Sequence, residues 1–391
     1  MARLGDFVEQ IRGVSYKPED IYDRLGENCI TLLRANNIRD GQLVFDDVIF
    51  VDKKRVHGNQ LLKAGDILIC TSSGSKELVG KAAYVKEDLP MTFGAFCKVV
   101  RPQKIRSDYL GHFFNSPNYR RKISDSSAGA NINNIRNEHI DELEILLPTT
   151  DKQEYVAVVL NKLTHLISLR KQQLSKLDEL VKARFVEMFG EPETNSKGWP
   201  IDNMCNLCSV GSSKRIYQSE QSSAGVAFLR ISDLTNLINT GVITESLYIP
   251  EKRYAELQAQ GQVPVKGDIL VTSRGTLGQC YIVKADNRFY FQDGMISWLS
   301  EYGDNITPIY ISYLFSMPGF RKQIDSMQAG STVAYLSIAM IKKLKVMVPD
   351  LEIQQQFTAF VAQADKSKLT IRQSLNKLEV LKKSLMQEYF G

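Results

Sequence analysis

Two long stretches of the chain carry apolar residues at helical spacing. From Asp151 to Met188 the sequence contains no proline or glycine, and its apolar residues recur at intervals of three, four and seven. These residues are Leu160, Leu163, Ile167, Leu174, Leu177, Val181 and Met188. The pattern is typical of a coiled-coil seam and predicts one helix about 55 Å long. The helix should end at Gly190, two residues before Pro192.

A second helix is expected from Leu351 to Tyr389. Its apolar stripe consists of Phe357, Phe360, Ala364, Ile371, Leu378, Leu381 and Leu385. Two helices of matched length and matched stripe can bury each other, and antiparallel packing would place two domains at opposite ends. The alternative is that each helix packs only on its own domain.

Residues 1–148 have a different pattern, in which short apolar runs alternate with turn residues. The runs are rich in β-branched and aromatic residues, which predicts strands at 28–34, 43–51, 66–70 and 96–100. Helical spacing predicts a helix at 107–115, and Pro117 is suited to begin another. The mixture has no regular strand–helix–strand rhythm, so we expect an α+β domain.

The whole arrangement occurs twice. Residues 176–190 resemble residues 377–391, which lie 201 positions later, and Gly65-Asp66-Ile67-Leu68 returns as Gly267-Asp268-Ile269-Leu270. Further matches link 116–123 with 317–324, 128–131 with 329–332 and, more loosely, 33–38 with 229–234. We align Thr71-Ser72-Ser73-Gly74 with Thr272-Ser273-Arg274-Gly275. The expected parts are a first domain at 1–148, a helix at 149–191, a second domain at 192–349 and a helix at 350–391.

The amino-acid composition says little about the functional class of the protein. The 391 residues carry a net charge of +5, spread evenly, so the bulk charge neither requires nor excludes nucleic acid. No apolar run approaches the roughly 20 residues that span a bilayer, and the N-terminus does not resemble a signal peptide. Six cysteines are few for a chain of this length and indicate reduced thiols in the cytoplasm.

Fragments that resemble catalytic motifs do not complete them. Gly74 and Gly80-Lys81 are separated by five residues rather than the four of a phosphate-binding loop, and Ala82 replaces the required Ser or Thr. Ser116-Pro117-Asn118-Tyr119 resembles an amino-group methyltransferase motif but lacks its second proline.

The sequence also lacks a convincing metal site or a set of acid–base catalytic residues. Cys205 and Cys208 have no second pair of ligands, and no histidine follows His165. We therefore expect no catalytic residue, no bound metal and no cofactor in this chain.

What remains are polar loops on a repeated scaffold. Asn and Arg side chains can pair bidentately with adenine and guanine, so such loops suit the reading of base edges. The plainer interpretation is that they are ordinary turns. The first copy offers as candidates Arg34, Asn36, Asn37, Thr71, Ser72, Ser73, Lys76, Asn131, Asn133, Asn134 and Arg136. The second offers Arg230, Ser232, Asp233, Thr272, Ser273, Arg274, Thr276, Thr332 and Tyr335.

Taken together, these features resemble the specificity subunit of type I restriction–modification systems over the whole chain. The resemblance rests on the two Gly-Asp-Ile-Leu blocks, the Ala-Gly blocks and the Phe-Gly helix ends at 190 and 391. Gly198-Trp199-Pro200 and the Gln354 helix start complete it. It implies two repeated α+β target recognition domains joined by two long antiparallel coiled-coil helices.

The resemblance also implies a function without catalysis. Each domain would read one half of a bipartite, asymmetric site in double-stranded DNA, and the helices would fix the spacer. Two DNA adenine methyltransferase subunits would dock on the chain and supply S-adenosylmethionine chemistry, and restriction subunits would add ATP-driven cleavage.

Two other classes stay open at this point. The duplicated domains could form a protein-interaction scaffold without DNA specificity, since divergent polar loops suit that role too. The chain could also methylate DNA itself, although we expect no methyl transfer by the purified chain alone.

Overall fold

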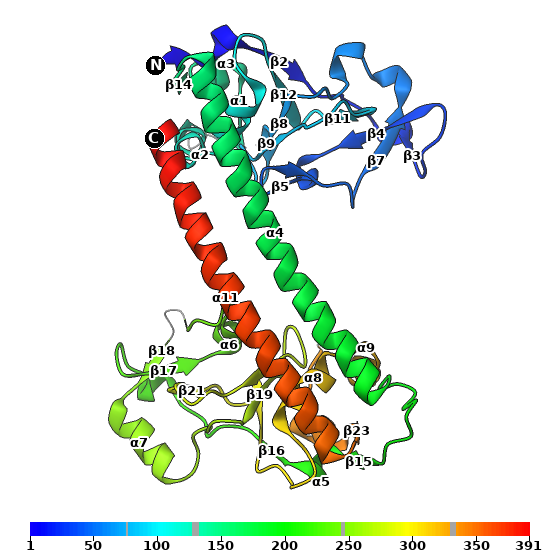
Figure 1. The fold of residues 1–391 in the computed structure, drawn as a ribbon, viewed down its shortest axis with the longest axis vertical. Coiled ribbons are helices and arrows are strands. Elements are labelled where there is room, and N and C mark those ends of the chain that lie inside the picture. The colour runs from blue at the N-terminus through cyan, green and yellow to red at the C-terminus, as the bar shows by residue number, and fades with distance from the viewer. Residues whose placement is uncertain (76, 127–132, 244–246, 329–333) are drawn as a thin grey trace. The chain divides into compact units, whose positions relative to one another are not determined.

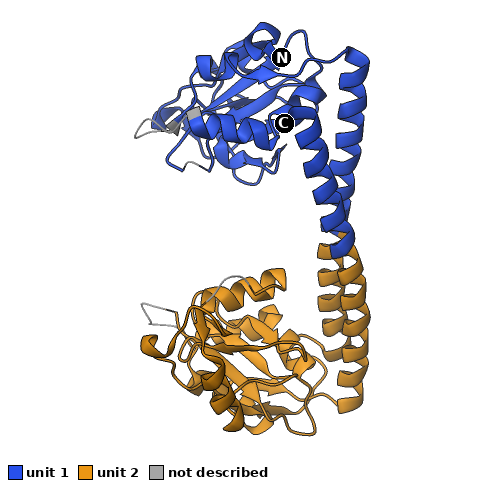
Figure 2. Ribbon diagram, turned by 90° about the vertical axis from the view of Figure 1, so that its left-hand side faces the viewer, with its two compact units in different colours: residues 1–172, 372–391 blue, residues 173–371 orange. Residues whose placement is uncertain are grey.

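The chain forms two compact units, shown in separate colours in Figure 2. The computed structural model describes residues 1–75, 77–126, 133–243, 247–328 and 334–391. Unit 1 comprises residues 1–172 and 372–391, and unit 2 comprises residues 173–371. The four parts predicted from the sequence keep helices and domains separate, whereas the compact units divide both helices. The four-part division therefore stays a prediction.

The domain of unit 1 contains two four-stranded sheets (Figure 1). The first is antiparallel, in the order β10 (Ala82–Tyr84), β8 (Ile67–Cys70), β12 (Cys97–Pro102) and β2 (Val8–Arg12). The second is ordered β11 (Met91–Phe93), β4 (Cys29–Leu33), β7 (Ile49–Asp52) and β3 (Ile21–Tyr22), with β11 and β4 parallel.

Shorter elements complete this domain. Three two-residue pairs join β1 (Ala2–Arg3) to β14 (Glu144–Ile145), β5 (Ile38–Arg39) to β6 (Gln42–Leu43), and β9 (Ser72–Ser73) to β13 (Asn133–Asn134). The helices are α1 (Ser107–Phe113), α2 (Pro117–Ser126) and α3 (Asn137–Asp141). Short 3-10 turns occupy Leu4–Phe7, Pro18–Asp20, Ala35–Asn37, Lys53–Arg55 and Gly58–Gln60. The strand expected at 43–51 is in fact divided between β6 and β7, because Asp46 and Asp47 bend the chain to pair with Arg39 and Arg34.

The domain of unit 2 repeats this plan with a smaller second sheet. Its antiparallel sheet is ordered β16 (Ser209–Gly211), β22 (Ile296–Ser300), β19 (Ile269–Thr272) and β20 (Cys280–Ile282). The other sheet is ordered β18 (Leu247–Ile249), β17 (Val226–Leu229) and β21 (Phe289–Phe291), with β17 and β21 parallel. A two-stranded pair joins β15 (Ile201–Asn203) to β23 (Lys345–Met347), and a 3-10 turn occupies Gln218–Glu220. The helices are α5 (Met204–Leu207), α6 (Ile231–Thr240), α7 (Glu251–Ala259), α8 (Pro308–Ser316), α9 (Pro318–Ser326) and α10 (Ile338–Lys343).

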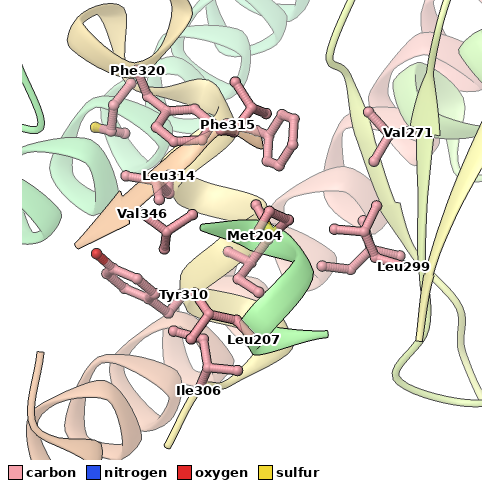
Figure 3. Close-up of a cluster of buried hydrophobic side chains, with 14 of the residues drawn as sticks. Met204, Leu207, Val271, Leu299, Ile306, Tyr310, Leu314, Phe315, Phe320 and Val346 are labelled. Atoms are coloured by element: carbon pink, nitrogen blue, oxygen red, sulfur yellow. The ribbon is translucent and has the colours of Figure 1, made fainter. Parts of the chain in front are cut away.

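The core of unit 2 forms where helices cover the β16–β22–β19–β20 sheet. Apolar side chains from α5, α8 and α9 converge there with others from the strands (Figure 3). The buried members labelled in the figure are Met204, Leu207, Val271, Leu299, Ile306, Tyr310, Leu314, Phe315, Phe320 and Val346. Unit 1 buries the equivalent side chains of α1 and α2, including Tyr109, Phe113 and Tyr119.

The two long helices are α4 (Thr150–Phe189) and α11 (Leu351–Phe390), and within each unit their segments run antiparallel. In unit 1, Leu160 near the start of α4 shares a core with Phe390 at the end of α11, and Lys171 pairs with Glu379 at 3.6 Å. In unit 2, Lys368 pairs with Asp178 at 2.7 Å. The predicted antiparallel helix pair is therefore confirmed.

One residue of the predicted stripe is misplaced. Leu381 is 47% exposed, although the pattern puts it on the buried face of α11. The buried face at this end runs through Leu378, Leu385, Met386 and Phe390, because α11 here packs on a domain as well as on α4. None of the helices in the described residues is long and apolar enough to cross a membrane.

The ends of the long helices dock in the same way in both units. The Phe390 ring lies 4.9 Å from the Tyr109 ring, and the Phe189 ring lies 4.8 Å from the Tyr310 ring, centroid to centroid. The hydroxyls of Tyr109 and Tyr310 donate to Leu146 O and Met347 O, both at 3.0 Å. Each unit is thus built from a domain, the start of one long helix and the end of the other.

Candidate nucleic-acid interface

In unit 1 the structure brings together two of the loops that the sequence singles out. Ser72 and Ser73 form the short strand β9, which pairs antiparallel with Asn134 and Asn133 of β13. The amide of Ile135 also donates to Thr71 O at 2.8 Å. Loops about 60 residues apart in the sequence therefore form one surface.

Unit 2 joins the corresponding loops. The amide of Leu336 donates to Ser273 O at 3.0 Å, as Ile135 does to Thr71. Beside this bond the Arg274 guanidinium carbon lies 5.1 Å from the centre of the Tyr335 ring. This is a cation–π contact in which the Arg274 side chain is exposed and the Tyr335 side chain is partly exposed.

The backbone bonds correct the sequence alignment by one residue. Thr71 N donates to Phe96 O, and Ser273 N donates to Met295 O, both at 2.9 Å. Thr71 is therefore equivalent to Ser273 and not to Thr272, which takes the place of Cys70. In the same register Ser72 corresponds to Arg274, and Asn134 corresponds to Tyr335. The alignment from sequence was wrong because it matched residue types across a loop whose length differs between the units. Nine residues lie between Cys70 and Gly80 and five between Thr272 and Gly278, although the two pairs share the same backbone bond.

The remaining predicted loop, at 34–37 in unit 1 and 230–233 in unit 2, is a capped turn in each unit. Asn37 Oδ1 accepts from Arg34 N at 2.8 Å, and Asp233 Oδ2 accepts from Arg230 N at 2.9 Å. The loose sequence match between 33–38 and 229–234 is therefore correct at these positions. Asn36 donates to the Asp47 carboxylate, so that side chain is also engaged.

The two arginines that begin these turns are held by carboxylates. Arg34 pairs with Asp47 at 2.9 Å and Arg230 with Asp233 at 3.0 Å. The Asp233 carboxylate raises the pKa of Arg230 above its ordinary value, mainly through their hydrogen bond. Both guanidiniums are partly exposed, so they can still reach a phosphate or a base edge.

Burial divides the predicted residues into two groups. Asn37, Thr71, Asp233, Thr272 and Ser273 are at most 7% exposed and bond within their own unit, which removes their side chains from direct base contact. The side chains that stay at least partly exposed are Arg34, Asn36, Ser72, Ser73, Asn134, Arg136, Arg230, Ser232, Arg274, Thr276 and Tyr335. Lys76, Asn131 and Thr332 lie outside the described residues, as does the side chain of Asn133.

Comparison with known proteins identifies what this repeated scaffold is. The family described as "Type I restriction modification DNA specificity domain" matches the chain twice, at residues 2–179 and 197–380. The chain belongs to this family. Its two domains are accordingly type I restriction–modification DNA specificity domains.

Relatives and solved structures agree with the assignment. The chain is 30% identical to the EcoKI specificity subunit of Escherichia coli K12, over 97% of this chain and 86% of that one. It is 40% identical to the StySPI specificity subunit of Salmonella potsdam, over 44% of this chain and 37% of that one. The fold resembles the crystal structure of a type I S subunit from M. genitalium, with a TM-score of 0.58, 14% identity and coverage of 100% and 95%. Specificity subunits recognise DNA and are not catalytic, so this chain is not an enzyme.

In each specificity domain, an arginine that was not among the predicted residues holds the loop that begins at Thr71 or Ser273, called the reading loop below. Arg120 of α2 donates to Val79 O at 2.7 Å and to Glu77 O at 2.9 Å. Arg321 of α9 donates to Leu277 O at 2.5 Å. The signal was present in the sequence, because both arginines occupy the same place in the repeated 116–123 and 317–324 blocks.

In unit 1, the surface formed by residues 71–73 and 133–135, called the reading surface below, has a second support. Lys98 of β12 is 8% exposed, and its ammonium donates to Gln10 Oε1 at 2.8 Å and to Asn137 Oδ1 at 2.5 Å. Burial lowers the pKa of Lys98. Asn137 begins α3, directly after the segment that pairs with β9, so the ammonium ties this segment to the sheet.

Burial shifts the titration of Cys208, one of the two cysteines considered for a metal site, and of His112, one of the four histidines of the chain. Burial raises the pKa of the Cys208 thiol to about 12, and burial lowers the pKa of His112 to about 4. Cys208 therefore stays protonated and His112 uncharged at neutral pH. Within the described residues, no group of three or more His, Cys, Asp or Glu side chains could hold a metal ion.

Proposed function

We propose that units 1 and 2 each read one half of a bipartite, asymmetric DNA site, and that they do so with different side chains on one repeated framework. The observation that carries this proposal is the pair of equivalent surfaces at Ser72–Asn134 and Arg274–Tyr335. The backbone bond beside each pair is the same, from Ile135 N to Thr71 O and from Leu336 N to Ser273 O. The exposed groups are a hydroxyl and an amide in unit 1 and a guanidinium and a phenol in unit 2.

These groups differ in what they can recognise. A guanidinium fits guanine O6 and N7 bidentately, whereas an amide fits adenine N6 and N7. We infer that unit 2 reads a guanine through Arg274 and that Asn134 of unit 1 reads an adenine. In this scheme the phosphates are contacted by Arg34, Arg136 and Arg230. Such contacts position a protein on DNA without specifying its sequence.

We further propose that α4 and α11 fix the number of unread base pairs between the half-sites. Each helix has 40 residues, which at ~1.5 Å per residue makes it about 60 Å long. In this scheme residues 1–148 and 192–349 act as readers, and residues 149–191 and 350–391 act as the spacer.

The proposed partners are two DNA adenine methyltransferase subunits, with restriction subunits in the complete complex, acting on DNA in the cytoplasm. An apolar stripe on α4 within unit 1 supports a docking role for the helices. Tyr155, Val158, Leu166 and Leu169 are each about 40–55% exposed and fall on one side of the helix. Exposed apolar side chains in such a row are typical of a protein interface.

Methylome sequencing of host cells with and without this chain tests the proposal. We expect a bipartite motif, methylated on adenine in both halves, that disappears when the chain is absent. If methylation is unchanged and no duplex is selected by the chain with its methyltransferase, the DNA-reading proposal fails and the scaffold interpretation gains. Methyl transfer by the purified chain alone would instead support the enzyme interpretation.

A further inference from the structure

Phe96 is the most exposed phenylalanine among the described residues, and it lies at the reading surface of unit 1. Its exposed fraction is 71%, against 49% for Phe45, the next most exposed phenylalanine among the described residues. It belongs to the turn at Gly94–Phe96, between β11 and β12. No ring contact involves Phe96 in the described part of the chain, and it belongs to none of the apolar cores there.

The backbone around this ring is firmly fixed. Phe96 O accepts from Thr71 N at 2.9 Å, from Ser72 N at 3.2 Å and from Thr71 Oγ1 at 3.1 Å. On the other side of the turn, Gly94 N donates to Leu33 O at 2.9 Å, next to Arg34. Phe96 therefore stands on a turn that is hydrogen-bonded to the Thr71–Ser72 loop and to the end of β4 beside Arg34.

Unit 2 has a different side chain at the same point. Met295 O accepts from Ser273 N, as Phe96 O does from Thr71 N, but the Met295 side chain is half-buried against the core beside β19. The scaffold does not require an exposed aromatic ring at this turn. The exposure of Phe96 is therefore specific to unit 1.

A single exposed apolar residue is common on protein surfaces. The significance of Phe96 lies in its position, because its backbone is bonded to Thr71 and Ser72. Apolar side chains presented at a DNA-binding surface can insert between base pairs and unstack them, and aromatic rings gain stacking energy with any base. An insertion of this kind needs a ring free of protein contacts on a backbone that does not yield. Phe96 meets both requirements.

We propose that Phe96 is an apolar wedge that inserts at a base step of the half-site read by unit 1. The proposal rests on the proposed DNA-reading function. It adds that this half-site is recognised through distortion of the duplex as well as through base edges, so a step that unstacks easily is favoured there. The half-site read by unit 2 is bound without an aromatic insertion from the equivalent turn.

The test uses the complex of the full chain with its methyltransferase subunits and a duplex that carries the methylated bipartite motif. In separate duplexes, 2-aminopurine replaces one adenine of the half-site or its flanks at a time, and its fluorescence reports unstacking. We expect a rise at one step with the wild-type chain and no rise with Phe96→Ala. We also expect Phe96→Ala to weaken binding by about fivefold or more, since stacking on a base is worth at least that factor.

Leu25→Ala is the matched control, because Leu25 is 61% exposed in the same unit but lies outside the reading loops. This variant should keep both the affinity and the fluorescence rise. Phe96→Trp should restore binding and show tryptophan emission that is quenched on DNA, in a unit whose own sequence contains no tryptophan.

Two results would overturn the wedge and leave the proposed function standing. One is tight, specific binding by Phe96→Ala with an unchanged fluorescence rise; the other is an unquenched Phe96→Trp. A wild-type complex that selects no bipartite duplex would instead remove the proposed function itself, and the wedge with it. The half-site of unit 1 is identified as the one whose recognition survives a substitution of Arg274.

Discussion

Unit 1 and unit 2 make the same backbone bonds around their reading loops and place different groups at the ends of those bonds. The Thr71 and Ser273 amides each donate to a carbonyl in the turn before β12 or β22, and their carbonyls accept from the segment before α3 or α10. Beyond these shared bonds, unit 1 presents Ser72 and an exposed Phe96, whereas unit 2 presents Arg274 on Tyr335. Main-chain bonds preserve the shape of the site, so side chains on the solvent side are free to change the recognised sequence.

The same contrast appears inside the domains. Asp66 and Asp268 occupy the same place, but Asp66 forms a two-bond pair with Arg101 and Asp268 accepts from the Trp298 indole at 2.8 Å. Asn118 donates to Phe390 O at 2.7 Å, while its counterpart is Gly319. A Cβ at Gly319 would lie 2.7 Å from Glu193 N, so the segment after α4 excludes a side chain there. This explains why the position of Asn118 in the motif at 116–119 is a glycine in unit 2.

The largest predicted effect comes from lengthening the two helices that both units share. We expect insertion of four residues near Ser175 of α4, matched by four near Ser374 of α11, to lengthen the unread spacer and leave both half-sites unchanged. Pairing the insertions preserves the helix register on either side, including the Lys171–Glu379 and Lys368–Asp178 ion pairs. Methylome sequencing provides the readout, and Ser175→Ala is the control. An unchanged spacer would show that the helices set no distance.

Each unit can next be weakened separately through the docked helix ends. Phe390→Ala should destabilise unit 1 and Phe189→Ala unit 2, each by about 3–5 kcal/mol, because a buried ring is replaced by a cavity. The two rings are 3% and 0% exposed. Hydrogen exchange resolved by unit measures the two stabilities. Equal loss in both units from either variant would contradict the assignment of each helix end to one core.

The paired aspartates should respond in opposite ways. Asp66→Asn breaks a buried ion pair and should cost unit 1 about 3 kcal/mol, since Arg101 keeps its charge without a partner. Asp268→Asn should change the stability of unit 2 by less than about 1 kcal/mol, because an amide oxygen can accept the same bonds. Denaturant titration followed by hydrogen exchange distinguishes the two. A large loss in both variants would mean that Asp268 has a cationic partner.

The pH dependence of unit 2 follows from the same carboxyl. Burial raises the pKa of Asp268 above the ordinary value of 3.8. The folded unit therefore binds this proton more tightly than the unfolded chain, and its stability falls as the pH rises from 3.8 through the raised pKa. Asp268→Asn should remove this decline, so wild-type and variant curves should differ in slope within that window and coincide below it.

The most localised effect concerns one half-site only. Arg274→Glu should weaken or relax recognition of the unit 2 half-site by about 1–3 kcal/mol, the usual worth of a bidentate base contact, and leave the other half-site unchanged. Selection of bound duplexes from a random pool measures both halves at once. Arg230→Glu, next to a capped turn in the same unit, separates a general charge effect from one specific to Arg274. Equal relaxation in both halves would contradict independent reading.

Much of this architecture could be predicted from the sequence, because its determinants are local. The stripes at three- and four-residue spacing specified α4 and α11 nearly to the residue, and the Gly-Asp-Ile-Leu blocks located β8 and β19. The equivalence of Arg34 with Arg230 was also correct. These features depend on short-range periodicity and on turns, which one sequence displays directly.

The features that the sequence did not reveal depend on partners far along the chain. The one-residue offset at Thr71 is visible only through bonds to Phe96 and Met295, and the exposure of Leu381 follows from what packs on α11. Phe96 was read as part of a strand, because nothing in an apolar run shows that one ring faces solvent. The burial of Asn37 and Asp233 was missed because polar side chains that cap a turn look the same in sequence as those that bind a ligand.

The assembly of unit 1 from separated segments has a consequence for synthesis on the ribosome. Residues 173–371 are contiguous, so unit 2 has all its parts once they have emerged. Unit 1 is complete only when Phe390 has been made. The Phe390 carbonyl accepts a hydrogen bond from the side-chain amide of Asn118, which lies 272 residues earlier in the chain. At roughly 5–20 residues per second that delay lasts about 15–55 s. The domain made first is completed last, and the side chains of Tyr109 and Asn118 that contact Phe390 stay uncovered throughout translation of the second.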